Sequence, residues 1–164
     1  MRTRRIMTIT VLIVVGGMAV NASWVQWVKQ PGIGQAEGAP IPTAGGTNDA
    51  RYRETVTVVA DEPIANVPGK RLVSRLVEYP PGGGTAPHHH ARSAFIYAYV
   101  LSGEVRSQVD DGPARVYRAG ETWFESPGAH HRVSVNASDT EPARLLAVIV
   151  VDEADKQLTI PDPR

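Results

Sequence analysis

Short apolar segments that alternate with a period of two residues fill the chain from Arg51 onward, and this pattern limits the possible folds more than any other feature. The segments are rich in Val, Ile, Tyr and Phe, which favour strands, and turns containing Gly and Pro separate them. The expected strands cover residues 53–60, 71–79, 94–101, 104–110, 114–120, 121–125, 130–136 and 143–152, with a further edge strand over 158–160. Regular spacing of this kind predicts one all-β domain over 51–164, an antiparallel sandwich or barrel.

The first 28 residues have the composition of an export segment. Three arginines precede an apolar run over 6–20, and Ala22 offers a small residue at a possible cleavage site, as in a signal peptide. Alternatively, the apolar run continues to residue 28, with Trp24 and Trp27 near its outer end, which fits an uncleaved membrane anchor of about 20 residues. Both alternatives bring the segment into contact with the membrane at least during export. Both predict an extracytoplasmic domain, either periplasmic or secreted, or one anchored to the membrane.

Residues 29–50 are rich in Gly, Pro and Ala without an apolar period, and they predict a flexible linker. The chain balances 17 Lys and Arg against 17 Asp and Glu, so its charge gives no indication of nucleic-acid binding. It contains no cysteine, which excludes disulfides, thiolate nucleophiles and cysteine-ligated zinc.

All five histidines fall into two clusters, residues 88–90 and 130–131. In an extended segment His88 and His90 leave the same face of the backbone, so they could bind one ion together, while His89 points the other way. Histidines next to turns are also often solvated. The metal-binding interpretation therefore depends on further ligands elsewhere in the chain.

The segment ESPGAHH supplies such ligands. A tight turn centred near Gly128 would join two paired strands and place Glu125 opposite His131 on one face. Three imidazoles and one carboxylate suit a divalent transition metal ion, namely Mn, Fe, Ni, Cu or Zn. The predicted ligands are His88, His90, His131 and Glu125. Alternatively, Glu125 ends its strand exposed to solvent or caps the following turn.

Two groups of residues resemble the two sequence motifs of the cupin family, over about residues 67–152. The matching positions are Gly82, His88, His90 and Gly103 for the first motif, and Gly120, Pro127, Gly128, His131 and, one place late, Asn136 for the second. The resemblance implies a double-stranded β-helix barrel of the RmlC-like jelly-roll type. It also implies a metal at His88, His90 and His131, and often a homodimer.

The glutamate of the first cupin motif is missing from this sequence. Counting from either side of the motif leads to Phe95 or Ile96. Either the three histidines hold the metal alone, or Glu125 from the second motif replaces the lost carboxylate.

The resemblance does not imply one reaction, because cupins include dioxygenases, isomerases, decarboxylases, sugar binders and storage proteins. A metal-dependent enzyme of the dioxygenase or isomerase type would act on a small organic molecule, with Glu125 or Tyr97 as candidate proton-transfer groups. A small-ligand binder or sensor without turnover, or a metal-free structural barrel, are the alternatives. Five aromatic residues are expected in the core or the pocket wall: Phe95, Tyr97, Tyr99, Trp123 and Phe124.

Overall fold

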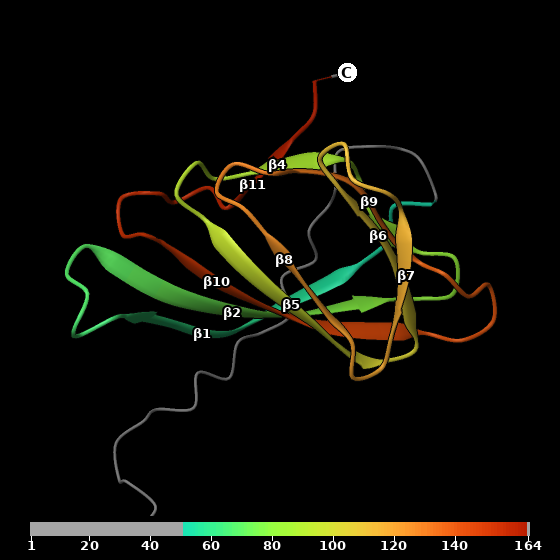
Figure 1. Cartoon of the computed structure of the whole chain (residues 1–164). Coiled ribbons are helices and arrows are strands. Elements are labelled where there is room, and N and C mark those ends of the chain that lie inside the picture. Colours follow the sequence, from blue (N-terminus) through green and yellow to red (C-terminus); the bar gives the residue numbers. More distant parts are fainter. Residues whose placement is uncertain (1–50, 164) are drawn as a thin grey trace, which may run out of the picture. The chain divides into compact units, whose positions relative to one another are not determined.

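The computed structural model of the chain describes residues 51–163, which form strands and turns without a helix (Figure 1). Within this range, no helix is long and apolar enough to cross a membrane. The export segment predicted for residues 1–28 and the linker predicted for 29–50 lie outside the described residues.

The strands of the described residues form two antiparallel sheets. The first sheet has the order β1-β2-β10-β5-β8, and the second has the order β11-β4-β9-β6-β7, with β3 paired to β9. The strands are β1 (Thr55–Pro63), β2 (Lys70–Tyr79), β3 (Gly84–Thr85), β4 (His88–His90), β5 (Phe95–Ser102), β6 (Glu104–Val109), β7 (Arg115–Arg118), β8 (Thr122–Glu125), β9 (His130–Asn136), β10 (Ala143–Asp152) and β11 (Thr159–Pro161). The predicted all-β class is confirmed, and the fold is a β-sandwich.

Alternation along the strands fills the space between the two sheets. On β5, Ile96, Ala98 and Val100 are buried, whereas the residues between them turn outward and are more exposed. β2 and β10 follow the same rule, so their Val, Leu and Ile side chains form two apolar clusters with those of β5. Burial of one face of each strand fixes the register, because a shift by one residue would expose this whole set.

Gly103 allows the chain to pass from the first sheet to the second between β5 and β6. Its φ of +71° lies in the left-handed region, and a Cβ at this position would come within 2.5 Å of the carbonyl oxygen of Pro142. Only glycine accommodates both conditions. This crossing leads β6 towards β9, the strand that carries one of the predicted metal ligands.

Candidate metal centre

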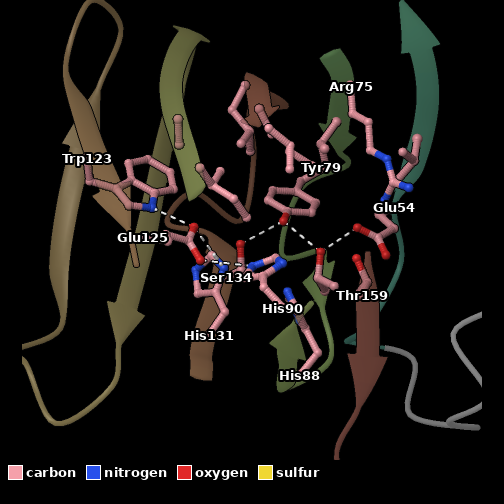
Figure 2. A pocket seen from close by; sticks show the side chains of 18 residues that line it. Glu54, Arg75, Tyr79, His88, His90, Trp123, Glu125, His131, Ser134 and Thr159 are labelled. Atoms are coloured by element: carbon pink, nitrogen blue, oxygen red, sulfur yellow. Dashed lines mark hydrogen bonds and ion pairs between the residues drawn. The ribbon is translucent and has the colours of Figure 1, made fainter. Parts of the chain in front are cut away.

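Strands β4 and β9 bring three predicted ligands together. His88 pairs directly with His131, and His90 lies two residues farther along β4 on the same face. The three side chains are buried, and their rings lie 4.7 to 6.0 Å apart between centroids. Their potential ligand atoms all lie within 4.8 Å of one another, so this group could hold one metal ion (Figure 2).

Glu125 reaches the histidines from the opposite sheet. The predicted hairpin between its strand and that of His131 is not present, because β8 pairs with β5 and β9 pairs with β3, β4 and β6. The turn instead connects the two sheets, and the N–H of Gly128 donates to the carbonyl of Ala91 at 3.1 Å. Glu125 is 2% exposed and faces the interior, which excludes the alternative of a solvent-exposed strand end.

The carboxylate of Glu125 contacts two of the imidazoles. Its Oε2 lies 2.9 Å from Nε2 of His90, and its Oε1 lies 3.4 Å from Nδ1 of His131. The indole N–H of Trp123 donates to Oε1 at 3.0 Å. The four residues His88, His90, His131 and Glu125 are called the metal centre below.

Two atoms of the metal centre are close together but unsatisfied. Nε2 of His90 and Oε2 of Glu125 are both buried, and neither makes a hydrogen bond of acceptable geometry despite their 2.9 Å separation. Buried polar groups in folded proteins normally have a partner. A cation bound to both atoms would satisfy them together.

Backbone carbonyls orient two of the rings. The Nδ1–H of His88 donates to the carbonyl of Ala86 at 2.7 Å, and the Nδ1–H of His90 donates to that of Leu158 at 3.2 Å. Each ring therefore keeps Nε2 free as a ligand atom, the arrangement by which outer hydrogen bonds fix a ligating histidine. His131 differs, because its Nε2 lies 2.9 Å from the hydroxyl of Ser107.

Burial and mutual contacts set the charge state of the centre. Burial, reinforced by the neighbouring imidazoles, lowers the pKa of His88 to about 3. Burial also lowers the pKa of His131, although Glu125 opposes this effect. For Glu125 itself burial raises the pKa, but contacts with His90, His131 and Trp123 outweigh it and hold the pKa well below its usual range. A neutral imidazole beside an ionised carboxylate is the state in which these groups bind a metal.

The register between β5 and β8 bears directly on the missing motif glutamate. Ile96 pairs with Glu125, so the two side chains are cross-strand neighbours on the inner face. Phe95, the other position reached by counting, faces outward and is 45% exposed. A carboxylate carried by β8 therefore lies beside the position at which the family motif places one on β5.

A cavity of about 130 Å³ extends from the metal centre between the sheets (Figure 2). Its walls are largely apolar, and its polar end away from Glu125 carries Glu54 and Arg75, with Tyr79, Thr85 and Ser134 between this end and the histidines. The Tyr79 hydroxyl lies 2.7 Å from that of Thr85 and 2.8 Å from that of Ser134, and the hydroxyl of Thr85 donates to Glu54. Burial raises the pKa of Tyr79 and of Glu54, which favours their protonated forms.

Arg75 adds a cation to this polar end. Its Nε is buried and makes no hydrogen bond, and burial lowers the pKa of the guanidinium. Neither Arg75 nor Tyr79 belongs to the site residues predicted from the sequence. A signal was nevertheless present, because Val73, Arg75, Val77 and Tyr79 alternate along β2, and an arginine on the inward face of a strand is unusual.

The expected aromatic pocket wall is only partly found. Trp123 lines the cavity, whereas Phe95, Tyr97 and Phe124 form a group on the outer face of β5 and β8, with ring centroids 5.3 and 5.8 Å apart. Tyr97 therefore does not line the cavity, because odd-numbered residues of β5 point away from it. Its placement gives no support to a proton-transfer function for this side chain.

Comparison with known proteins identifies relatives by sequence. A family model described as "Cupin domain" matches residues 75–149. Over 78 residues the chain is 32% identical to the cupin-domain-containing oxidoreductase fogC of Aspergillus ruber. That match covers 48% of this chain and 37% of the relative, so less than half of the relative is represented.

Solved structures show the same fold at low sequence identity. A predicted oxalate decarboxylase from Thermotoga maritima has a TM-score of 0.55 at 22% identity, with coverage of 71% of this chain and 96% of that chain. The oxalate decarboxylase of Lactobacillus farciminis, solved as a formate complex, has a TM-score of 0.54 at 20% identity, with coverage of 76% and 33%. At these identities the similarity concerns the fold alone.

Proposed function

The chain belongs to the cupin superfamily, and we propose that it binds a divalent transition metal ion and, beside it, a small organic molecule. The observation that carries this proposal is the buried, unsatisfied pair formed by Nε2 of His90 and Oε2 of Glu125. Without a cation, two buried polar atoms lack partners, which costs free energy. With one, they and the imidazoles of His88 and His131 would supply the ligands.

A set of three imidazoles and one carboxylate suits Mn, Fe, Ni, Cu or Zn. When bound, such an ion would supply Lewis-acid or redox chemistry. The chain itself would contribute the orientation of the ligands: Trp123 holds one carboxylate oxygen, and the carbonyls of Ala86 and Leu158 hold two rings. The apolar walls of the cavity would limit access of water to a bound molecule.

The far end of the cavity indicates what kind of molecule would fit. Arg75 offers a buried guanidinium nitrogen without a hydrogen-bond partner, at the end of a mostly apolar cavity. A small molecule with an apolar body and an acidic group would satisfy this nitrogen while reaching the metal centre. The name of the sequence relative, an oxidoreductase, is compatible with an oxidisable ligand.

Turnover by a dioxygenase or isomerase type of reaction is one form of this proposal, and binding without turnover is the other. The contacts of Glu125 favour a ligand over a proton-transfer group, because its pKa is low and its Oε1 accepts a hydrogen bond from Trp123. Tyr97 lies outside the cavity lining. Both features leave the proton-transfer step without an assigned residue and so favour the binding form.

We further propose an extracytoplasmic location, through a cleaved signal peptide or a membrane anchor over 1–28, and a homodimer. The composition of 1–28 supports the first, and the cupin relationship supports the second. N-terminal sequencing of the protein from cell fractions distinguishes cleavage from anchoring. A cytoplasmic, uncleaved product would refute the export proposal, and a monomer in light scattering would refute the dimer.

Elemental analysis tests the metal centre. The full chain, purified without a histidine tag, should contain metal that is lost in the double variant His88→Ala/His131→Ala. Glu121→Gln changes an exposed carboxylate outside the metal centre and serves as a control that should keep its metal. If the parent takes up no ion that depends on His88 and His131, even after reconstitution with each candidate metal, the proposal is wrong.

A further inference from the structure

A second group of potential ligands lies on the outer face of the strands that build the metal centre. His89 of β4 pairs directly with His130 of β9, and their rings stack with centroids 4.1 Å apart and planes 9° apart. The same register turns His88 and His131 inward and these two residues outward, because side chains alternate along a strand. Asp162, just after β11, completes what is called the outer cluster: His89, His130 and Asp162.

The carboxylate of Asp162 faces both rings. Its Oδ1 lies 3.1 Å from Nδ1 of His89, and its Oδ2 lies 2.8 Å from Nε2 of His130. The three residues offer ligand atoms that all lie within 4.8 Å of one another. Strand pairing fixes the position of Asp162, because its own N–H donates to the carbonyl of Pro87 at 3.2 Å and Ile160 pairs with His89.

We propose that the outer cluster is a second binding site for a divalent transition metal ion, of the class that includes Zn²⁺, Ni²⁺ and Cu²⁺. Two imidazoles and a carboxylate form a ligand set that these ions prefer. Because the two rings stack almost parallel, one of them has to turn about its side-chain torsions for both nitrogens to face one ion. The side chains of His89, His130 and Asp162 are 48%, 22% and 28% exposed, so an ion can enter from solvent and water can complete its coordination. An ion pair between protonated histidines and Asp162 would use the same atoms, and the test below separates the two.

The outer cluster is connected to the metal centre through β11. The carbonyl of Leu158, just before this strand, accepts the hydrogen bond that orients His90, and Thr159 lines the cavity. An outer ion would tie Asp162 to β4 and β9 and would thereby restrain the segment that orients His90. We therefore expect the outer ion to strengthen metal binding at the centre, and the centre to strengthen the outer site by the same factor. This coupling rests on the proposed metal centre, whereas the existence of the outer site does not.

Zinc stoichiometry tests the outer site. The full chain, purified without a histidine tag and stripped with a chelator, is dialysed against buffered Zn²⁺ and its zinc content is measured. Asp162→Asn and His130→Asn should each hold one zinc ion fewer per chain than the parent. Glu153→Gln, which changes another exposed carboxylate before β11, should hold as many as the parent. The side chain of Asp162 contacts His89 and His130 outside the apolar core, and circular dichroism of Asp162→Asn checks that a loss of zinc does not reflect unfolding.

The outcomes separate this inference from the proposed function. Suppose that the parent holds one ion, which is lost in His88→Ala/His131→Ala but retained in Asp162→Asn. This result would show that the outer cluster is an ion pair only. If the parent holds one ion that is lost in Asp162→Asn and retained in the double variant, this result would support the outer site and refute the metal centre. Zinc content unchanged in both outer variants would overturn the outer site, as would a parent without zinc.

Discussion

Acidification from pH 7 to pH 5 should destabilise the metal-free protein through the buried histidines of the metal centre. Burial lowers the pKa of His88 from 6.5 to about 3. In this pH range the unfolded chain takes up a proton on His88, whereas the folded protein does not. Because the unfolded state then binds more protons, the free energy of unfolding falls as the pH falls.

The size of the effect follows from linkage. Consider a histidine whose pKa is near 6.5 in the unfolded chain and which remains neutral in the folded state. Acidification from pH 7 to pH 5 then lowers the free energy of unfolding by about 2 kcal/mol, since each pKa unit corresponds to about 1.4 kcal/mol. This figure is insensitive to the folded pKa, provided that it lies well below 5. The pKa of His131 is shifted in the same direction and should add to the loss. Burial raises the pKa of Glu54, so the folded protein takes up a proton on Glu54 more readily than the unfolded chain does. Acidification therefore stabilises the protein through Glu54, which opposes the loss caused by the histidines.

Urea unfolding of chelator-treated protein at pH 7, 6 and 5 measures the loss. Comparison with His88→Gln isolates one histidine, because Glu54 and the other acids are present in both proteins. The parent should lose about 2 kcal/mol more than the variant between pH 7 and pH 5. An equal loss in both proteins would show that His88 is protonated in the folded state, and the reasoning about its burial would be refuted.

Three further substitutions test the fold and the polar end of the cavity. Gly103→Ala should lower the free energy of unfolding by more than about 2 kcal/mol in urea unfolding, because its Cβ would meet the carbonyl of Pro142 and its φ would be strained. Tyr79→Phe should cost about 1 to 3 kcal/mol in the same assay, since it leaves buried hydroxyl partners unsatisfied. Glu54→Gln should gain stability relative to the parent, in free energy of unfolding, as the pH rises above 4.5. Burial raises the pKa of Glu54, so its ionisation lowers the stability of the parent and has no counterpart in the variant. A difference that does not depend on pH would contradict this.

The strands and the histidine pattern could be predicted because they depend on local sequence. Alternation alone placed His88 and His90 on one face, and the structure shows both buried on the inner side of β4. The route of the chain after Glu125 could not be predicted in this way. A Pro-Gly turn fits a hairpin as well as a crossing between sheets, and the choice depends on a distant partner, the carbonyl of Ala91.

The polar end of the cavity was missed for the same reason. Tyr79 contacts Ser134, 55 residues away, and Thr85 contacts Glu54, 31 residues away. Each residue by itself resembles an ordinary strand position. Their function as a group appears only once β2, β3 and β9 are placed together, which requires the topology of both sheets.

The pairing of Ile96 with Glu125 gives a direct test of whether Glu125 supplies the missing motif carboxylate. Glu125→Ile should weaken metal binding by about 10-fold or more, because it removes the only carboxylate in the predicted ligand set of four. Adding Ile96→Glu should restore much of this affinity, because both side chains are buried on the inner face and Ile96 already lines the cavity.

Competition with a chromophoric chelator measures the affinity of each variant, and circular dichroism confirms that each is folded. Ile96→Gln/Glu125→Ile is the matched control, because it has a side chain of the same size without the charge, and it should remain weak. Ile96→Glu alone should be less stable than the parent at neutral pH, since two carboxylates would then face each other in a buried site. If the relocated carboxylate binds metal no better than the glutamine control, a carboxylate at position 96 cannot replace Glu125. If Glu125→Ile binds metal as tightly as the parent, three histidines alone hold the ion.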